Sequence, residues 1–292
     1  MTQELETKDG SVASAHPADA QGKPAVSGHQ GKPRQHDKVT RMGTESIPRL
    51  ITEFAVPSIL GMLVNGAYNV IDSIFLGQAM GEIGLSTATV AMPIMTVFMA
   101  IAMLVGNGGN ALAALRMGEG KPEEAERSLG NTVTLSLIAS VVVAIAVFVP
   151  VCINALLSVS GATPEDWNYA MQFIRIISLG FIFQCIGMGV NNFIRTAGAP
   201  NRALGTMIIG AVTCTLFNAL FVLVMGMGVV GSALATVCGQ AISCATVLWY
   251  FCLTKGVPMR LHLHMMPLHG ETVRLILSLG LASFAVQAGM AA

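Results

Sequence analysis

The sequence predicts an all-α integral membrane protein: a lobe of six transmembrane helices, a partial seventh helix and a disordered N-terminal tail. The first observation is composition, because 53% of the 292 residues are hydrophobic and only 11% are charged. That is far more apolar than a soluble domain of this length. The second observation is that the apolar residues form separate runs, each long enough to cross a bilayer as a helix, which takes about 20 residues.

Four regions follow in chain order. Residues 1–46 are polar, rich in Gly, Pro, Ala, His and Lys, and lack apolar periodicity. We therefore expect a disordered cytoplasmic tail. Residues 47–253 are expected to form the six-helix lobe, and 254–271 a cytoplasmic loop. Residues 272–292 are expected to begin a second lobe that is cut off.

The apolar runs place the individual spans. Six helices are expected, at about 54–76, 89–112, 131–153, 170–194, 204–225 and 230–252. The charged stretch 116–127 is expected to be a loop between the second and third spans. Residues 203–254 are uncharged and too long for one span, so the turn at Gly226-Met227-Gly228 is expected to divide them.

The basic residues predict the orientation of the spans. Of the sixteen Lys and Arg, seven precede the first span, three lie in 116–127, two are Arg195 and Arg202, and three lie in 255–274. The loops expected on the opposite side contain none, and Arg175 near the outer end of the fourth span is the exception. By the positive-inside rule, the N-terminus and 116–127 are cytoplasmic in a multi-pass protein of the plasma membrane, or of the inner membrane in a Gram-negative cell.

A polar stripe marks the first span. Pro57, Gly61, Asn65, Asn69 and Asp72 are spaced by four, four, four and three residues, so they share one helix face. A carboxylate at depth in a bilayer costs roughly 2.5 kcal/mol or more, and such residues usually face a cavity or the bundle interior. The stripe therefore predicts an ion or proton site in a transporter. Alternatively, Asp72 lies near a helix end and is merely hydrated. The proline can bend the helix.

An internal similarity suggests a repeat. Residues 49–67 align with 274–292 at an offset of 225, with Arg, Leu, Ile and Ser coinciding at four positions. Both segments follow a polar basic stretch and begin a span that runs outward from the cytoplasm. Because many transporters are built from repeated halves, we expect the chain to be the first half of a longer arrangement.

Several functional classes are excluded by the sequence. The formal net charge of zero argues against a nucleic-acid partner. The six cysteines show no CxxC or Cys/His spacing, so no metal site is expected. There is no P-loop and no catalytic constellation, so neither ATP-driven transport within the chain nor an enzyme is expected.

Three separated motifs resemble one family. The stretches 68–94 (YNVIDSIFLGQAMGEIGLSTATVAMPI), 191–204 (NNFIRTAGAPNRAL) and 227–240 (MGVVGSALATVCGQ) resemble the MATE multidrug exporters, with the MepA-like branch closest. The resemblance covers about 45–292. It implies one of two six-helix lobes around a central cavity, together with the start of helix 7. It also implies export of small organic cations and drugs in exchange for H⁺ or Na⁺, with no other cofactor.

The resemblance also implies particular site residues. Asp72 matches the acid of the cation site on helix 1, Pro57 matches the proline at which that helix bends, and Thr236 matches a threonine of helix 6. Asn218 stands where related members have Asp, and Cys214 where they have Asn. This departure puts a full Na⁺ site in doubt, since a hard cation favours several oxygen ligands. A single carboxylate with amide and hydroxyl neighbours still suffices for one proton.

The expected coupling set is therefore Asp72, Asn69, Asn218 and Thr236. Asn65, Gln184, Asn191 and Asn192 are candidates for lining the cavity. Alternatively, these amides make only hydrogen bonds between helices.

The leading functional hypothesis is cation/drug antiport. One alternative is a truncated lobe that transports nothing, or a half-transporter that pairs with a second lobe or with a second copy of the chain. A flippase for lipid-linked substrates is a further alternative, disfavoured because the spans offer Arg175 as their only cation.

Overall fold

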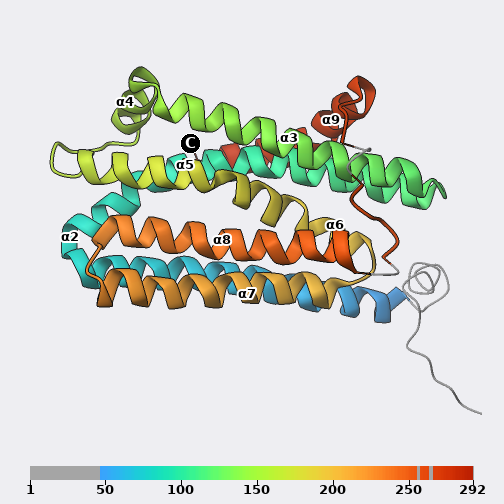
Figure 1. The fold of residues 1–292 in the computed structure, drawn as a ribbon, viewed down its shortest axis with the longest axis horizontal. Coiled ribbons are helices and arrows are strands. Elements are labelled where there is room, and N and C mark those ends of the chain that lie inside the picture. The colour runs from blue at the N-terminus through green and yellow to red at the C-terminus, as the bar shows by residue number, and fades with distance from the viewer. Residues whose placement is uncertain (1–46, 255–256, 263–265, 292) are drawn as a thin grey trace, which may run out of the picture. The chain divides into compact units, whose positions relative to one another are not determined.

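The computed structural model describes residues 47–254, 257–262 and 266–291, and the predicted tail at 1–46 lies outside the described residues. Within that part of the chain the fold consists of helices and short connections (Figure 1). The helices are α2 (Ile47–Gly118), α3 (Pro122–Phe148), α4 (Pro150–Val159), α5 (Trp167–Gly189), α6 (Asn191–Thr196), α7 (Pro200–Asn218), the π-helix η1 (Ala219–Val224), α8 (Gly228–Leu253) and α9 (Gly270–Ala291).

Six helical segments of the described residues are long and apolar enough to cross a membrane, which confirms the six-helix lobe. They are Ile51–Gln78, Met80–Gly118, Pro122–Phe148, Trp167–Thr196, Pro200–Val224 and Gly228–Leu253. The expected turn is also present, because Gly226 and Gly228 have φ angles of 63° and 57°. Helix α9 provides the helix expected after residues 254–271, and it begins at Gly270.

The first two spans are joined by a bend at one glycine rather than by a loop. Helix α2 contains both spans, and at Gly81 the backbone leaves the helical range, with φ 59° and ψ −134°. A residue with a Cβ rarely adopts such a φ, whereas glycine does so at little cost. The bend therefore turns the chain back into the lobe without a connecting segment.

The expectation of a loop at 116–127 was wrong for most of that stretch. Helix α2 continues to Gly118 and α3 begins at Pro122, so the connection is only 119–121. Proline fits the first turn of a helix, and Glu123 and Glu124 there favour the helix dipole. Charged residues thus extend both helices beyond the apolar spans.

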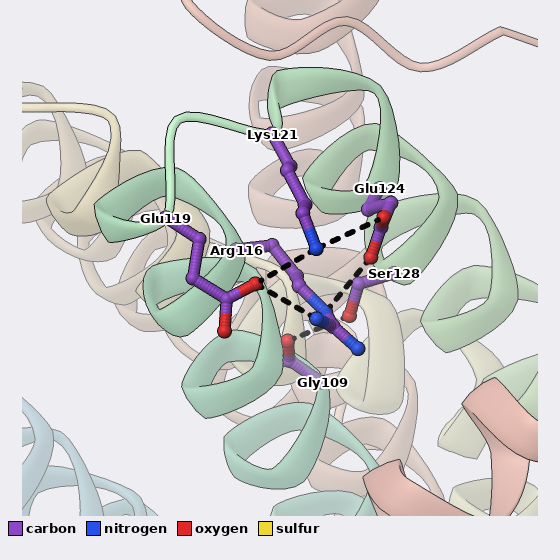
Figure 2. Close-up of polar contacts among 6 residues, drawn as sticks. All are labelled: Gly109, Arg116, Glu119, Lys121, Glu124 and Ser128. Atoms are coloured by element: carbon purple, nitrogen blue, oxygen red, sulfur yellow. Dashed lines mark hydrogen bonds and ion pairs between the residues drawn. The ribbon is translucent and has the colours of Figure 1, made fainter.

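Charged side chains cross-link this turn (Figure 2). The guanidinium of Arg116 lies 2.8 Å from Glu119 and 3.0 Å from Glu124, and Lys121 lies 3.4 and 3.7 Å from the same two carboxylates. The hydrogen bond from Arg116 holds the pKa of Glu119 below its usual range. Ser128 ties the two helices together by donating to the carbonyl oxygen of Gly109, at 2.9 Å.

The third span ends earlier than expected. Helix α3 stops at Phe148 and a separate helix, α4, begins at Pro150. Proline disfavours helical angles in the residue before it, and Val149 has an extended ψ of 119°. The apolar run that predicted one helix over about 131–153 therefore contains a break.

Helix α8 lies between α5 and α7 (Figure 1). The close approach of α7 to α8 depends on Gly239 of α8. A Cβ there would lie 2.7 Å from Cβ of Cys214 and 3.0 Å from the carbonyl oxygen of Gly210, both on α7. Only glycine fits this spacing without a shift of the backbone. The close crossing sets Cys214 and Asn218 of α7 against α8.

The segment 257–262 and 266–269, which we call the connecting strap, lies along α3. Val257 and Met259 are buried, and both belong to a core cluster to which α2, α3, α5, α6, α7 and α8 contribute. Three hydrogen bonds join the strap to α3: Arg260 N to Glu126 Oε1 at 2.8 Å, Thr134 Oγ1 to Met266 O at 2.9 Å, and His269 N to Asn131 Oδ1 at 3.1 Å.

Candidate functional site

Three spans meet at the carboxylate of Asp72. This residue lies on the first span, before the bend at Gly81, and is partly buried. Asn218 of α7 donates from Nδ2 to Asp72 Oδ1 at 2.8 Å, and Ser232 of α8 donates from Oγ to the same oxygen at 2.9 Å. Asp72 is therefore held inside the bundle by neutral donors from two other helices.

Local irregularities position both donors. Asn218 is the last residue of α7 before the π-helix η1, and Ser232 lies one turn into α8, after the positive φ of Gly228. The two side chains are 1% and 0% exposed. Short π-helical turns within α-helices are frequent at functional sites. The wider turn follows directly on the residue that contacts Asp72.

A second group of side chains continues from Asn218. Its Nδ2 lies 3.5 Å from Cys214 Sγ, and that sulfur lies 4.0 Å from Thr236 Oγ1. The hydroxyl of Tyr68 donates to the same Thr236 oxygen at 3.4 Å. Thr236 therefore reaches Asp72 through Cys214 and Asn218 rather than by direct contact.

The electrostatic surroundings of Asp72 are unusual for a membrane-embedded acid. Among the described residues no Lys, Arg or His forms an ion pair with it, and both hydrogen bonds to it end on one oxygen, Oδ1. The carbonyl oxygen of Asn218, Oδ1, is buried and accepts no hydrogen bond from the described residues. Burying a polar oxygen without a hydrogen-bond donor costs free energy. The arrangement suits a small exchangeable cation or a proton.

The structure thus brings together three of the four predicted coupling residues, and sequence reasoning missed two others. Asp72, Asn218 and Thr236 share one network, whereas the side chain of Asn69 lies outside the described residues. The missed residues are Ser232 and Tyr68. Each lies four residues before a predicted one, Thr236 and Asp72 respectively, so the helical repeat placed both on the predicted faces.

The asparagines of the fourth span make hydrogen bonds between helices. Asn191 is buried and donates to Thr206 Oγ1 and, at 3.1 Å, to the carbonyl oxygen of Ala203, both on α7. Asn192 donates to Asn107 Oδ1 on α2 at 2.8 Å. This is the arrangement that the alternative interpretation described, and a cavity-lining role for them remains a prediction.

The other predicted positions lie on the same elements as expected. Gln184 is 8% exposed on α5, and its Oε1 accepts no hydrogen bond from the described residues. Asn65 is partly buried and Pro57 is buried, both on the first span. The non-helical angles within α2 are at Gly81 and not at Pro57, so bending at the proline also remains a prediction.

Comparison with known proteins decides the family. A model of the MatE family matches residues 57–220, which is more than half of the chain. The matched region includes Asp72 and Asn218, which form the closest contact at the site. The chain belongs to the MATE family.

Curated relatives carry names that refer to multidrug export or to multidrug resistance. The Multidrug export protein MepA of Staphylococcus haemolyticus is 23% identical over 206 residues, covering 70% of this chain and 45% of that protein. The Probable multidrug resistance protein YpnP of Bacillus subtilis is 25% identical over 232 residues, covering 78% of this chain and 50% of that protein. The chain therefore spans about half the length of these relatives.

Solved MATE structures share the fold. The MATE multidrug transporter DinF-BH is 36% identical with a TM-score of 0.79, covering 85% of this chain and 55% of that one. The inward-facing conformation of a multidrug resistance MATE family transporter is 25% identical with a TM-score of 0.71, covering 77% and 50% respectively.

Proposed function

We propose that this MATE-family chain forms the first lobe of a multidrug antiporter of the plasma membrane, with a cytoplasmic N-terminus. In this proposal it exports small organic cations in exchange for a cation that loads at Asp72. The observation that carries the proposal is the contact of Asp72 with Asn218 and Ser232, at 2.8 and 2.9 Å. It links one carboxylate to three spans, so a change of charge there acts on all of them.

The donor set favours H⁺ over Na⁺ as the coupling cation. Sodium prefers several oxygen ligands, and here a thiol, Cys214, stands among the side chains around the carboxylate. A proton needs only one acid with partners in both states. Ionised Asp72 accepts from Asn218 and Ser232. When Asp72 is protonated, a half-turn of the Asn218 amide presents its unpartnered Oδ1 as acceptor.

The proposal includes a second lobe. The curated relatives are about twice as long as the region they share with this chain. Alternating access in such transporters is largely a rocking of one repeat against the other around a site at their interface. The drug would then bind between the lobes, and the state of Asp72 would bias which side is open.

The test is gradient-driven ethidium export by the two-lobed transporter in proteoliposomes. A pH gradient should drive export in the wild type, and Asp72→Asn should abolish it. Asp166→Asn is the matched control, because Asp166 is a buried acid that bonds to Ser86 and Thr163 away from the site. Its export should persist. Undiminished pH-driven export in Asp72→Asn would contradict the proposal, and export driven only by a sodium gradient would identify Na⁺ as the coupling ion.

The same assay on the 292-residue chain alone separates the remaining alternatives. Export that depends on Asp72 would identify a half-transporter that works as a self-associated pair. Absence of export from correctly inserted chain would rule out the self-associated pair and leave a lobe that needs a second lobe or one that transports nothing.

A further inference from the structure

The fourth span runs to Thr196 and therefore contains Arg195 as well as Arg175, contrary to the expectation that Arg175 is the only cation of the spans. Arg195 sits in the last turn of the fourth span, on α6, at the end expected to face the cytoplasm. Its Nη1 donates to Asn192 Oδ1 at 3.2 Å, and its Nη2 lies 3.4 Å from Met207 Sδ on α7. A Cβ on Gly61 would lie 3.3 Å from Nη2, so the guanidinium also rests against the first span.

The cationic head of Arg195 is poorly satisfied. A guanidinium carries five N–H donors, and here one bond goes to an amide oxygen and one to a thioether, which is a weak acceptor. Its Nε is buried and has no hydrogen-bond partner among the described residues. In that part of the chain no carboxylate lies within ion-pair distance of Arg195.

Other arginines of the lobe are accommodated differently. Arg116 pairs with two glutamates, Arg175 lies 5.9 Å from the ring centre of Phe148, and Arg202 lies 5.5 Å from that of Tyr250. Aromatic faces attract cations at such distances. Among the described residues, neither a carboxylate nor an aromatic ring pairs with Arg195. An ionisable residue within a span is a functional-site hypothesis by default.

The position of Arg195 is fixed by a polar wall. Asn192, which accepts from Arg195, donates in turn to Asn107 of α2 at 2.8 Å. One turn further along α6, Thr196 donates to Asn110 of α2 at 2.7 Å. The wall holds Nη1 of the guanidinium, while Nη2 lies against the sulfur of Met207 and Nε has no partner among the described residues. Methionine is flexible, so its thioether can move aside.

We propose that Arg195 anchors a binding site for an oxyanion of the phosphate class, which displaces Met207 and accepts hydrogen bonds from Nε and Nη2. Two parallel N–H bonds from arginine to one oxyanion are the strong, specific form of this interaction. The phosphate group comes from one of two sources: a free phosphate in the cytoplasm or the headgroup of an anionic lipid. Basic sites between spans on the cytoplasmic side bind such headgroups. The proposal does not depend on proton coupling at Asp72.

The experiment has two arms on the purified chain. In the first, the chain in phospholipid-free detergent is titrated with sodium phosphate against sodium chloride of equal ionic strength, and thermal unfolding gives the Kd. In the second, native mass spectrometry measures retention of phosphatidylglycerol against phosphatidylcholine. The variants are Arg195→Gln and Arg202→Gln, the latter a matched control because Arg202 is an exposed arginine close by in sequence, on α7.

Free phosphate is identified as the ligand if the wild type binds it in the first arm, Arg195→Gln weakens that binding by about tenfold or more, and Arg202→Gln does not weaken it. The same pattern in the second arm alone identifies the lipid headgroup. The proposal is overturned if the wild type binds in neither arm, or if Arg195→Gln binds as the wild type does.

Two further variants keep the test decisive. If Arg195→Gln does not fold, Arg195→Lys replaces it, and the loss of the two parallel bonds should weaken binding by about tenfold. Equal binding by Arg195→Lys would overturn the proposal. Met207→Ala should bind as tightly as the wild type or more tightly, because the sulfur is displaced in the bound state. A tenfold loss in Met207→Ala would overturn the proposed place of the oxyanion.

Discussion

Ser232 offers the sharpest test of the site, because the structure and not the sequence identified it. Ser232→Ala removes one of the two donors to Asp72 and leaves the rest of α8 unchanged. The hydroxyl is 0% exposed and lies 2.9 Å from the carboxylate oxygen, so water does not simply replace it. We expect the free energy of unfolding to fall by about 1.5–3 kcal/mol, the range for hydrogen bonds to charged groups.

The destabilisation caused by Ser232→Ala should depend on the charge of residue 72. In an Asp72→Asn background the acceptor is neutral, and the same substitution should cost only about 0.5–1.5 kcal/mol. The double-mutant cycle therefore predicts a coupling energy of about 1–1.5 kcal/mol between the two side chains. That coupling is what distinguishes a partner of the carboxylate from a serine that merely fills space.

The assay is reversible unfolding in mixed detergent micelles at alkaline pH, where the carboxylate is ionised. Ser243→Ala is the matched control on the same helix, because Ser243 bonds to the backbone oxygen of Thr206 at a long 3.4 Å. It should cost about 0.5 kcal/mol or less in both backgrounds. An equal cost of Ser232→Ala with and without the Asp72 carboxylate would refute the proposed contact.

Three further predictions follow from the fold. A reporter placed at Pro164 should be accessible from outside the cell and one at Gly120 from the cytoplasm, as cysteine labelling would show; the reverse would overturn the orientation. Gly239→Ala should destabilise the lobe by about 1–3 kcal/mol, because its Cβ would lie 2.7 Å from that of Cys214, whereas Gly205→Ala, with no atom within 4 Å, should not. The carboxyl of Glu119 should titrate below its usual range by NMR and return toward it in Arg116→Gln. The pairing of Glu119 with Arg116 therefore stabilises the folded state at neutral pH, and this stabilisation is lost as the pH falls through the lowered pKa of Glu119.

The spans could be predicted from the sequence because hydropathy reports the part of a helix that lies in lipid. It does not report where the helix ends, so it missed the extension of α2 and α3 through the charged residues of 116–127. Glycine can bend a helix or simply pack within it. The pattern around Gly81 therefore could not show that the first two spans are joined without a loop.

The candidate site was partly predictable for a similar reason. Asp72 stood out because a carboxylate is rare in a span, and its resemblance to a family motif led to Asn218 and Thr236. The hydroxyl of Ser232 carries no such signal, since serine is common at helix contacts in membranes. Its role depends on how α8 is rotated relative to α2, which packing decides. The partner of Asn192 was hidden likewise, because Asn107 lies on a different span.

The connecting strap has a practical consequence for anyone who divides or labels this protein. Although it reads as a hydrophilic linker, cutting the gene within it would expose Val257 and Met259 and break its hydrogen bonds to α3. A two-fragment version joined there would begin from a damaged lobe. The exposed turn at Gly161 suits insertion of a fluorescent protein better, because it lies between α4 and α5 and outside both helices. A tag there would leave the ion pairs of the 119–121 turn and the hydrogen bonds of the strap in place.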